Sequence, residues 1–131
     1  MEKEFVPYEQ ALALKELGFD EKCFGFYTEE YRKLIKNFCK YPINLPTKPF
    51  LAPTFSQAFR WFREKYNLCG EVYTVNMGAI DYTFLIRDLY SEDVKYDNFD
   101  ANTGGYSGTF NTYEEVELEC LKKLIEIVKQ K

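Results

Sequence analysis

The residues best suited to chemistry lie in a polar, glycine-containing segment, residues 91–111. Oxygen-bearing side chains and a glycine alternate along it as in a calcium-binding loop: Asn98, Asp100, Asn102 and Gly104. The register of an EF-hand fails, because a loop beginning at Asp100 would need a carboxylate at Gly104 and a glutamate at Asn111. We therefore expect no metal ion and interpret the segment as a solvated loop.

The run G-G-Y-S-G-T at residues 104–109 precedes an expected helix, an arrangement that can hold a phosphate group at the helix N-terminus. It lacks the lysine of a P-loop, and Glu114 and Glu115 would repel an anion there. We retain Tyr106 as a candidate binding residue, since tyrosines and carboxylates near residues 91–111 could serve a small-ligand binder or an unconventional enzyme. This is the alternative to a non-catalytic function.

Histidine is absent from the sequence. Enzymes that rely on it are excluded, namely hydrolases with a histidine base and metalloenzymes with an H-E-x-x-H motif. The sequence still permits catalysis by carboxylate, tyrosine or lysine side chains, but these residues form no catalytic motif. We therefore assign no catalytic residue and no cofactor, and we expect a protein that is not an enzyme.

The four cysteines lie far apart and form no C-x-x-C pair: Cys23, Cys39, Cys69 and Cys120. A zinc site normally has closely spaced pairs, so we expect four free thiols that behave as small apolar side chains. The sequence has neither a signal-peptide pattern nor an apolar run long enough to span a membrane. Both features predict a cytoplasmic protein.

Composition predicts one packed domain over residues 1–131. Hydrophobic residues make up 46% of the chain and aromatic residues 18%, which is enough for a core, and the length is usual for a single domain. The net charge of −4 opposes a broad phosphate-binding surface, so nucleic acid is not an expected partner.

Three segments begin as helices do. Thr54 and Thr112 each precede a Gln or Glu by three residues, which is the spacing of a capping box. Pro7 stands where the first turn of a helix tolerates a residue without an N–H group. Apolar residues recur at helical spacing after each start, which predicts helices over residues 8–17, 55–66 and 113–129.

Between these helices the sequence favours strands at residues 23–28, 71–77 and 80–89. Residues 29–38 fit either a helix or the second strand of a hairpin. Four prolines between residues 42 and 53 predict a connection that can be neither a regular helix nor a central strand. The fold class is therefore α+β, a two-layer domain with three helices packed on one face of a three- or four-stranded antiparallel sheet.

The expected helix over residues 55–66 carries Trp61 beside its polar side. Together with Arg60 and Arg63, this tryptophan could form an amphipathic contact patch of the kind enriched at protein interfaces. The alternative is that Trp61 packs at the rim of the core. We name Arg60, Trp61 and Arg63 as candidate binding residues.

The expected helix over residues 113–129 has an apolar stripe for the core and a second stripe with the spacing of a coiled-coil seam. The second stripe consists of Leu118, Leu121, Ile125 and Val128. Either the helix over residues 8–17 covers this seam, or a partner does. A homodimer through the seam is the simplest form of the second alternative, because a two-fold axis lets one patch cover itself.

Three blocks carry a resemblance: Y-E-Q-A-L-A-L-K-E-L-G-F-D-E (residues 8–21), Q-A-F-R-W-F-R-E-K-Y (57–66) and T-Y-E-E-V-E-L-E-C-L-K-K-L-I-E-I-V-K (112–129). As a set they resemble a family of small uncharacterised proteins from gut-type bacteria, tailed phages and other mobile elements, which has no established activity. The resemblance implies an accessory protein of a phage or mobile element and favours the hairpin for residues 29–38. We therefore predict a non-catalytic intracellular interaction protein, whose partner is another protein or a second copy.

Overall fold

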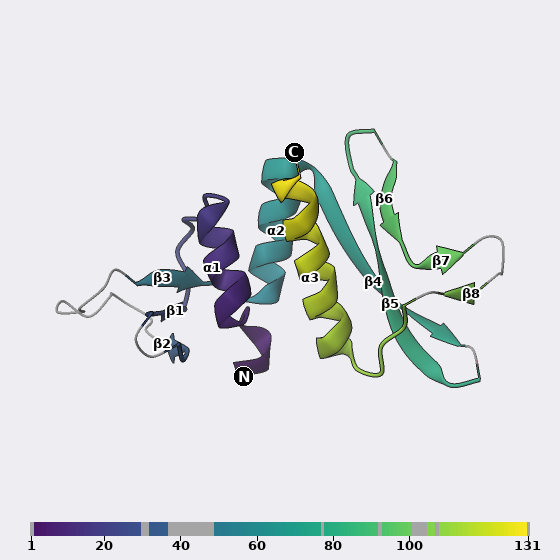
Figure 1. Cartoon of the computed structure of the whole chain (residues 1–131), viewed down its shortest axis with the longest axis horizontal. Helices are drawn as coiled ribbons and strands as arrows, with labels where there is room; N and C mark the ends of the chain where they lie inside the picture. The colour runs from purple at the N-terminus through teal and green to yellow at the C-terminus, as the bar shows by residue number, and fades with distance from the viewer. Residues whose placement is uncertain are drawn as a thin grey trace. The chain divides into compact units, whose positions relative to one another are not determined.

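The computed structural model describes residues 2–29, 32–36, 49–76, 78–91, 93–100, 105–106 and 108–130, and the statements below concern these residues. The chain divides into two compact units, Met1–Ala58 and Phe59–Lys131 (Figure 1). Each unit is described by itself, and one domain over residues 1–131 stays a prediction.

The predicted α+β class is confirmed. The described residues form three α-helices and two three-stranded antiparallel sheets, together with a two-stranded ribbon. The strands are thus divided between two sheets, whereas the sequence suggested one. Strand alternation identifies strands but not their neighbours, because pairing depends on contacts between segments far apart in the chain.

The first unit begins with a short 3₁₀-helix, η1 (Glu2–Glu4), followed by helix α1 (Tyr8–Glu16). Pro7 precedes α1 in an extended conformation, and the helix ends one residue before the predicted end, with Leu17 as its C-cap. Gly18 then adopts a left-handed φ of 99° that side chains disfavour. The Phe19 N–H donates to the carbonyl oxygen of Leu14 at 2.9 Å and closes this end of the helix.

The sheet of the first unit has the order β2-β1-β3, formed by β1 (Gly25–Tyr27), β2 (Ile35–Lys36) and β3 (Phe50–Ala52). The antiparallel pairing of β1 with β2 identifies the described part of residues 29–38 as a hairpin. Strand β3 lies in the predicted proline-rich connection. It is an edge strand, and this agrees with the exclusion of a central strand.

In the second unit the sheet has the order β4-β5-β6, formed by β4 (Leu68–Asn76), β5 (Ile80–Asp88) and β6 (Val94–Asp97). Helix α3 (Tyr113–Lys129) packs on β4 and β5 (Figure 1). Residues Phe84 and Ile86 alternate along β5 and are buried, as the predicted strand pattern required.

Helix α2 (Phe55–Tyr66) has the predicted apolar stripe. The stripe residues Phe55, Ala58, Phe59 and Phe62 are buried, whereas Arg60, Arg63 and Glu64 are exposed. After the helix, Asn67 adopts a φ of 57° and turns the chain into β4.

Both predicted threonine caps are present. The Thr54 hydroxyl accepts from the Gln57 N–H, and the Thr112 hydroxyl accepts from the Glu115 N–H, each at 3.2 Å. The Gln57 side-chain amide donates to the carbonyl oxygen of Lys22 at 2.8 Å, so this residue ties the start of α2 to the first unit's loop.

The prediction of an irregular loop over residues 91–111 is wrong. The segment contains β6, β7 (Phe99–Asp100) and β8 (Gly105–Tyr106), and Phe110 pairs with Tyr82 of β5. These strands are too short for an alternating pattern to reveal them. Strand β6 is held by its pairing with β5, and β7 and β8 pair with each other.

Asn98, which we treated as a calcium-ligand candidate, is instead buried in a hydrogen-bond chain. The Tyr96 hydroxyl donates to Asn98 Oδ1 at 2.7 Å, and Asn98 Nδ2 donates to the Thr83 hydroxyl at 3.0 Å. The Thr83 hydroxyl then donates to the Gly108 carbonyl oxygen at 2.8 Å. These hydrogen bonds join Asn98 and Gly108 to Thr83 of β5.

Gly70 marks the closest approach of α3 to β4. A Cβ atom added at Gly70 would lie 2.6 Å from Cys120 Sγ and 3.4 Å from Leu124 Cδ1. We expect Gly70→Ala to lower the free energy of unfolding by about 1–3 kcal/mol, because the added methyl group overpacks this contact. Adding Cys120→Ala should recover part of the loss, as chemical denaturation followed by circular dichroism would show.

The control for this pair is Gly78→Ala. No described atom lies within 4 Å of the Cβ position at Gly78, whose φ of 97° makes any side chain unfavourable for the backbone alone. Cys120→Ala should therefore not relieve the cost of Gly78→Ala. Strict additivity of Gly70→Ala and Cys120→Ala would contradict the close packing.

Candidate interaction surface

A turn joins β5 to β6 (Figure 1). Apolar side chains at this turn and at the start of β6 are exposed to solvent. Tyr90 is 88% exposed, and Leu89 and Val94 are each 47% exposed. Exposed apolar side chains that form a contiguous patch can mark a contact surface. We call Leu89, Tyr90 and Val94 the exposed turn.

Hydrogen bonds hold the backbone of the exposed turn in one shape. The carboxylate of Asp88 accepts from the Tyr90 N–H at 2.8 Å and from the Ser91 N–H at 3.2 Å, as an aspartate at the start of a turn does. The Asp88 N–H donates to the Asp93 carbonyl oxygen at 2.7 Å. A turn ordered in this way loses little conformational entropy when it binds.

A further bond ties the exposed turn to the end of α2. The Leu89 N–H donates to the carbonyl oxygen of Asn67 at 2.7 Å. Because Asn67 adopts its left-handed conformation directly after α2, the helix end anchors the base of the turn.

The surroundings of the exposed turn are acidic. Residues 59–131 contain 13 acidic and 9 basic residues, which accounts for the whole net charge of −4. Asp88, Asp93 and Asp97 lie at the turn or on β6, against two basic residues, Lys95 on β6 and Arg87, which pairs with Val94. The combination of apolar tip and acidic flank is complementary to a basic surface with an apolar pocket.

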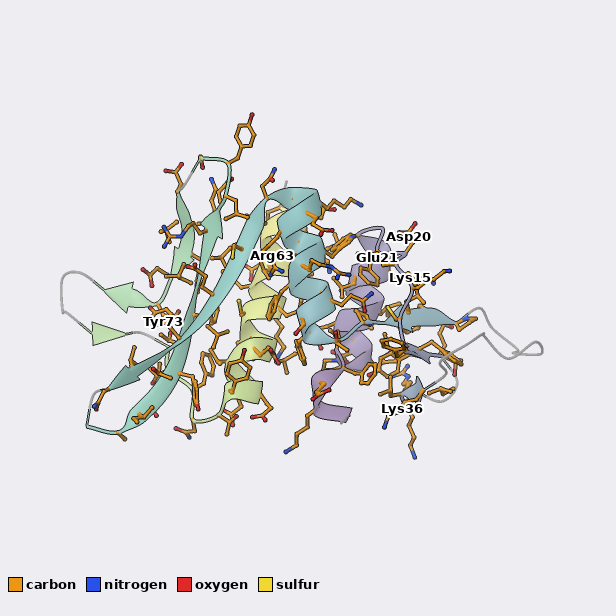
Figure 2. All side chains as sticks on the ribbon, turned by 180° about the vertical axis from the view of Figure 1, so that it is seen from behind. Lys15, Asp20, Glu21, Lys36, Arg63 and Tyr73 are labelled. Carbon is orange, nitrogen blue, oxygen red and sulfur yellow. The ribbon has the colours of Figure 1, made fainter. Side chains whose placement is uncertain are left out.

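The predicted patch on α2 is not assembled as a whole. Arg60 and Arg63 are exposed, and Figure 2 labels Arg63 on this helix. Trp61 is only 5% exposed and makes edge-on contacts with the rings of Phe62 at 5.1 Å and Tyr66 at 5.4 Å between centroids. Its placement agrees with the alternative of a core tryptophan.

The residues of the predicted seam on α3 are largely buried. Leu121, Ile125 and Val128 are buried, and Leu118 is half-buried. This burial does not agree with an exposed dimer interface. The spacing alone could not decide, because a helix buried on two sides has the same pattern as a helix with a free seam.

The side chain of the candidate binding residue Tyr106 and part of the calcium-like segment lie outside the described part of the structure. Tyr106 is in β8, but its side chain is outside the described part of the structure, as are residues Asn102 and Gly104. Within the described part, no group of three or more acidic or cysteine side chains could hold a metal ion. Among the described helices, none combines the length and the apolar character that crossing a bilayer requires.

The described cysteines are free thiols, and their surroundings suppress thiolate formation. Burial raises the pKa of Cys23 to about 12, and the charge of Glu21 adds to this effect. Burial also raises the pKa of Cys69, with Glu71 adding to the shift and Arg63 and Arg87 opposing it. Burial raises the pKa of Cys120 as well. These thiols are therefore not activated nucleophiles, and Cys39 lies outside the described residues.

The exposed turn is the feature that we did not identify from the sequence. A signal is present: Leu89 and Tyr90 stand between Asp88 and Ser91, two residue types that favour turns. The alternation of β5 does not need an aromatic residue in the turn that follows, and the Tyr90 side chain is 88% exposed.

Comparison of the chain with protein-family models, with curated proteins and with solved structures gave no match. The resemblance of residues 8–21, 57–66 and 112–129 to small phage and bacterial proteins therefore stays a prediction.

Proposed function

We propose that the protein is a non-catalytic interaction protein that binds a basic partner protein through the exposed turn. The observation that carries this proposal is Tyr90, whose side chain is 88% exposed on a turn held by the Asp88 carboxylate. A large aromatic side chain on an ordered turn is the type of residue that supplies most of the binding energy at protein interfaces.

The contributions of the two parts of this surface differ. Leu89 and Tyr90 supply apolar area that leaves water when the partner binds, which favours a long-lived complex. The flanking Asp93 and Asp97 are exposed and mainly accelerate association with a positively charged partner. Binding should therefore weaken with rising salt without being abolished by it.

The biological setting of the proposal comes from the resemblance in the sequence. It implies an accessory protein that works inside a bacterial cell and is encoded by a phage or mobile element. A regulatory or host-directed role fits a small protein without an assigned catalytic residue.

The test compares proteins retained from a bacterial lysate by the wild-type chain and by the double variant Leu89→Ser/Tyr90→Ser. Both changes are at exposed positions, so the free energy of unfolding should change by about 0.5 kcal/mol or less at each. We expect a basic protein that the wild type retains and that the variant loses at least tenfold, as measured by quantitative mass spectrometry.

The matched control is Ile80→Ser at the opposite end of β5. Ile80 is 68% exposed but lies outside the exposed turn, so its replacement removes a similar apolar side chain without altering the proposed surface. Equal retention by all three proteins, or equal loss in the control, would contradict the proposal.

A further inference from the structure

A pocket of about 180 Å³ lies in the second unit between α3 and the strands that follow β5. One wall comes from the rings of Phe84, Tyr96 and Phe110, and the other from side chains of α3. The pocket is separate from the exposed turn, which does not contribute to its lining.

The rings of the first wall form a row. The Tyr96 and Phe84 rings stack with centroids 5.3 Å apart, and the Phe84 and Phe110 rings stack with centroids 6.4 Å apart. Phe84 is buried in the middle of the row, and Tyr96 and Phe110 are half-buried. Tyr96 is further held by the bond from its hydroxyl to Asn98, so the wall is ordered before any ligand arrives.

The opposite wall presents two pairs of opposite charge on one helix. Lys122 Nζ lies 3.1 Å from Glu119 Oε1, and Lys123 Nζ lies 3.2 Å from Glu126 Oε1. The four side chains are between 29% and 52% exposed, so water reaches them from the mouth of the pocket. The wall offers two ammonium groups and two carboxylates with no net charge.

The two charge pairs can exchange partners at small cost. Exposed ion pairs between residues three apart on a helix contribute little to stability. A ligand that carries both an ammonium and a carboxylate group can therefore replace one intramolecular pair with two new pairs. A ligand with a single charge would leave one lysine or glutamate without its partner.

The position of Lys123 shows that the aromatic wall already interacts with a cation. Its Nζ lies 4.6 Å from the centroid of the Tyr96 ring, within the range of a cation–π contact. The same lysine is paired with Glu126, so ring, ammonium and carboxylate lie together at one end of the pocket.

We infer that this pocket binds a free α-amino acid with a large apolar side chain. The side chain would lie at the Phe110 end of the row, because Phe84 and the Lys123 ammonium already contact the Tyr96 ring. The zwitterionic head would pair with the lysines and glutamates of α3. The pocket volume of about 180 Å³ is large enough to admit one ring. This inference is independent of the exposed turn and gives the protein a second, ligand-binding role.

The test is a titration of the isotope-labelled protein with L-phenylalanine, followed by amide chemical shifts. We expect saturable shifts at Tyr96, Phe110 and residues 119–126, with none at Leu89 and Tyr90. Absence of saturable shifts at about 10 mM ligand, where even a millimolar affinity would be visible, would overturn the inference.

Three analogues separate the parts of the ligand. 2-Phenylethylamine lacks the carboxylate, 3-phenylpropanoate lacks the ammonium group, and glycine lacks the side chain. Each should bind at least about tenfold more weakly than L-phenylalanine, because each loses one class of contact. Equal affinity of any one analogue would show that the contact it lacks is not made, and would overturn the assignment of the ligand class.

Variants of α3 locate the binding site. Lys123→Gln and Glu126→Gln each remove a charge at the pocket, and we expect about a tenfold loss of affinity for L-phenylalanine from each. The matched control is Lys129→Gln, which makes the same change at an exposed position of α3 outside the pocket lining. Unchanged affinity in both pocket variants, or an equal loss in the control, would overturn the location.

Discussion

The double variant Leu121→Glu/Ile125→Glu is expected to be unfolded in dilute buffer at neutral pH. Both side chains are buried in α3, so each replacement places a carboxylate where water is excluded. An unpaired buried charge costs several kcal/mol, and two together match the whole stability of about 5–15 kcal/mol of a domain this size. Circular dichroism would show the loss of helix, and light scattering would report the mass.

The matched control adds two glutamates to the exposed side of the same helix, as Lys122→Glu/Lys129→Glu. These residues are exposed, so the control should stay folded and lose about 1–2 kcal/mol, the sum of two surface changes and a less favourable helix end. If Leu121→Glu/Ile125→Glu were folded with the mass of the parent, burial of the seam would be wrong. A folded monomer from a dimeric parent would restore the seam as an interface.

Phe62→Ala is expected to lower the free energy of unfolding by about 3–5 kcal/mol, as removal of a large aromatic side chain from a core does. Phe62 is fully buried, and its ring contacts those of Trp61 at 5.1 Å and Tyr66 at 6.0 Å between centroids. Its replacement therefore leaves a cavity and also removes two ring contacts. Denaturant unfolding followed by circular dichroism gives the free energy.

Arg60→Ala is the control for Phe62→Ala, since Arg60 lies on the exposed side of the same helix. We expect its effect on the free energy of unfolding to stay within about 0.5 kcal/mol. Similar losses for the two variants would show that the buried face of α2 is assigned wrongly.

The helices could be predicted because their signals are local. Thr54 and Thr112 cap α2 and α3 as their spacing indicates, and Gly18 follows the end of α1. Each signal depends on hydrogen bonds within a few residues, which the order of residue types determines. The α+β class follows from the helices together with the alternation in β4 and β5.

The third strand of the second unit could not be predicted, because its signals are not local. Val94 to Asp97 alternates apolar and polar residues over four positions only, which is too short to identify a strand, and β6 depends on its pairing with β5. The burial of Asn98 likewise depends on Thr83, fifteen residues away in the chain. A polar residue that a sequence places in a solvated loop can be buried when distant hydroxyl groups satisfy its amide.

The candidate sites could not be predicted for the same reason, because they depend on contacts between segments far apart in the chain. Leu121 and Ile125 of α3 were predicted to lie in an interface but are buried. The prediction differed because helical spacing shows that a face is apolar but not what covers it. The pocket combines residues of α3 with Tyr96 and Phe110, and no spacing rule connects these segments. Only the three-dimensional arrangement brings them together.

Strand β4 has a consequence for the solubility of the chain while it folds. It is an edge strand of nine residues, L-C-G-E-V-Y-T-V-N, without proline or lysine, and Glu71 is its single charged residue. Exposed edges of this kind template the pairing of strands from different chains, and natural proteins interrupt them with charge. Glu71 lies near Arg87 with 3.6 Å between Oε2 and Nε, so we expect it to oppose aggregation of newly made chains as well as to join β4 to β5.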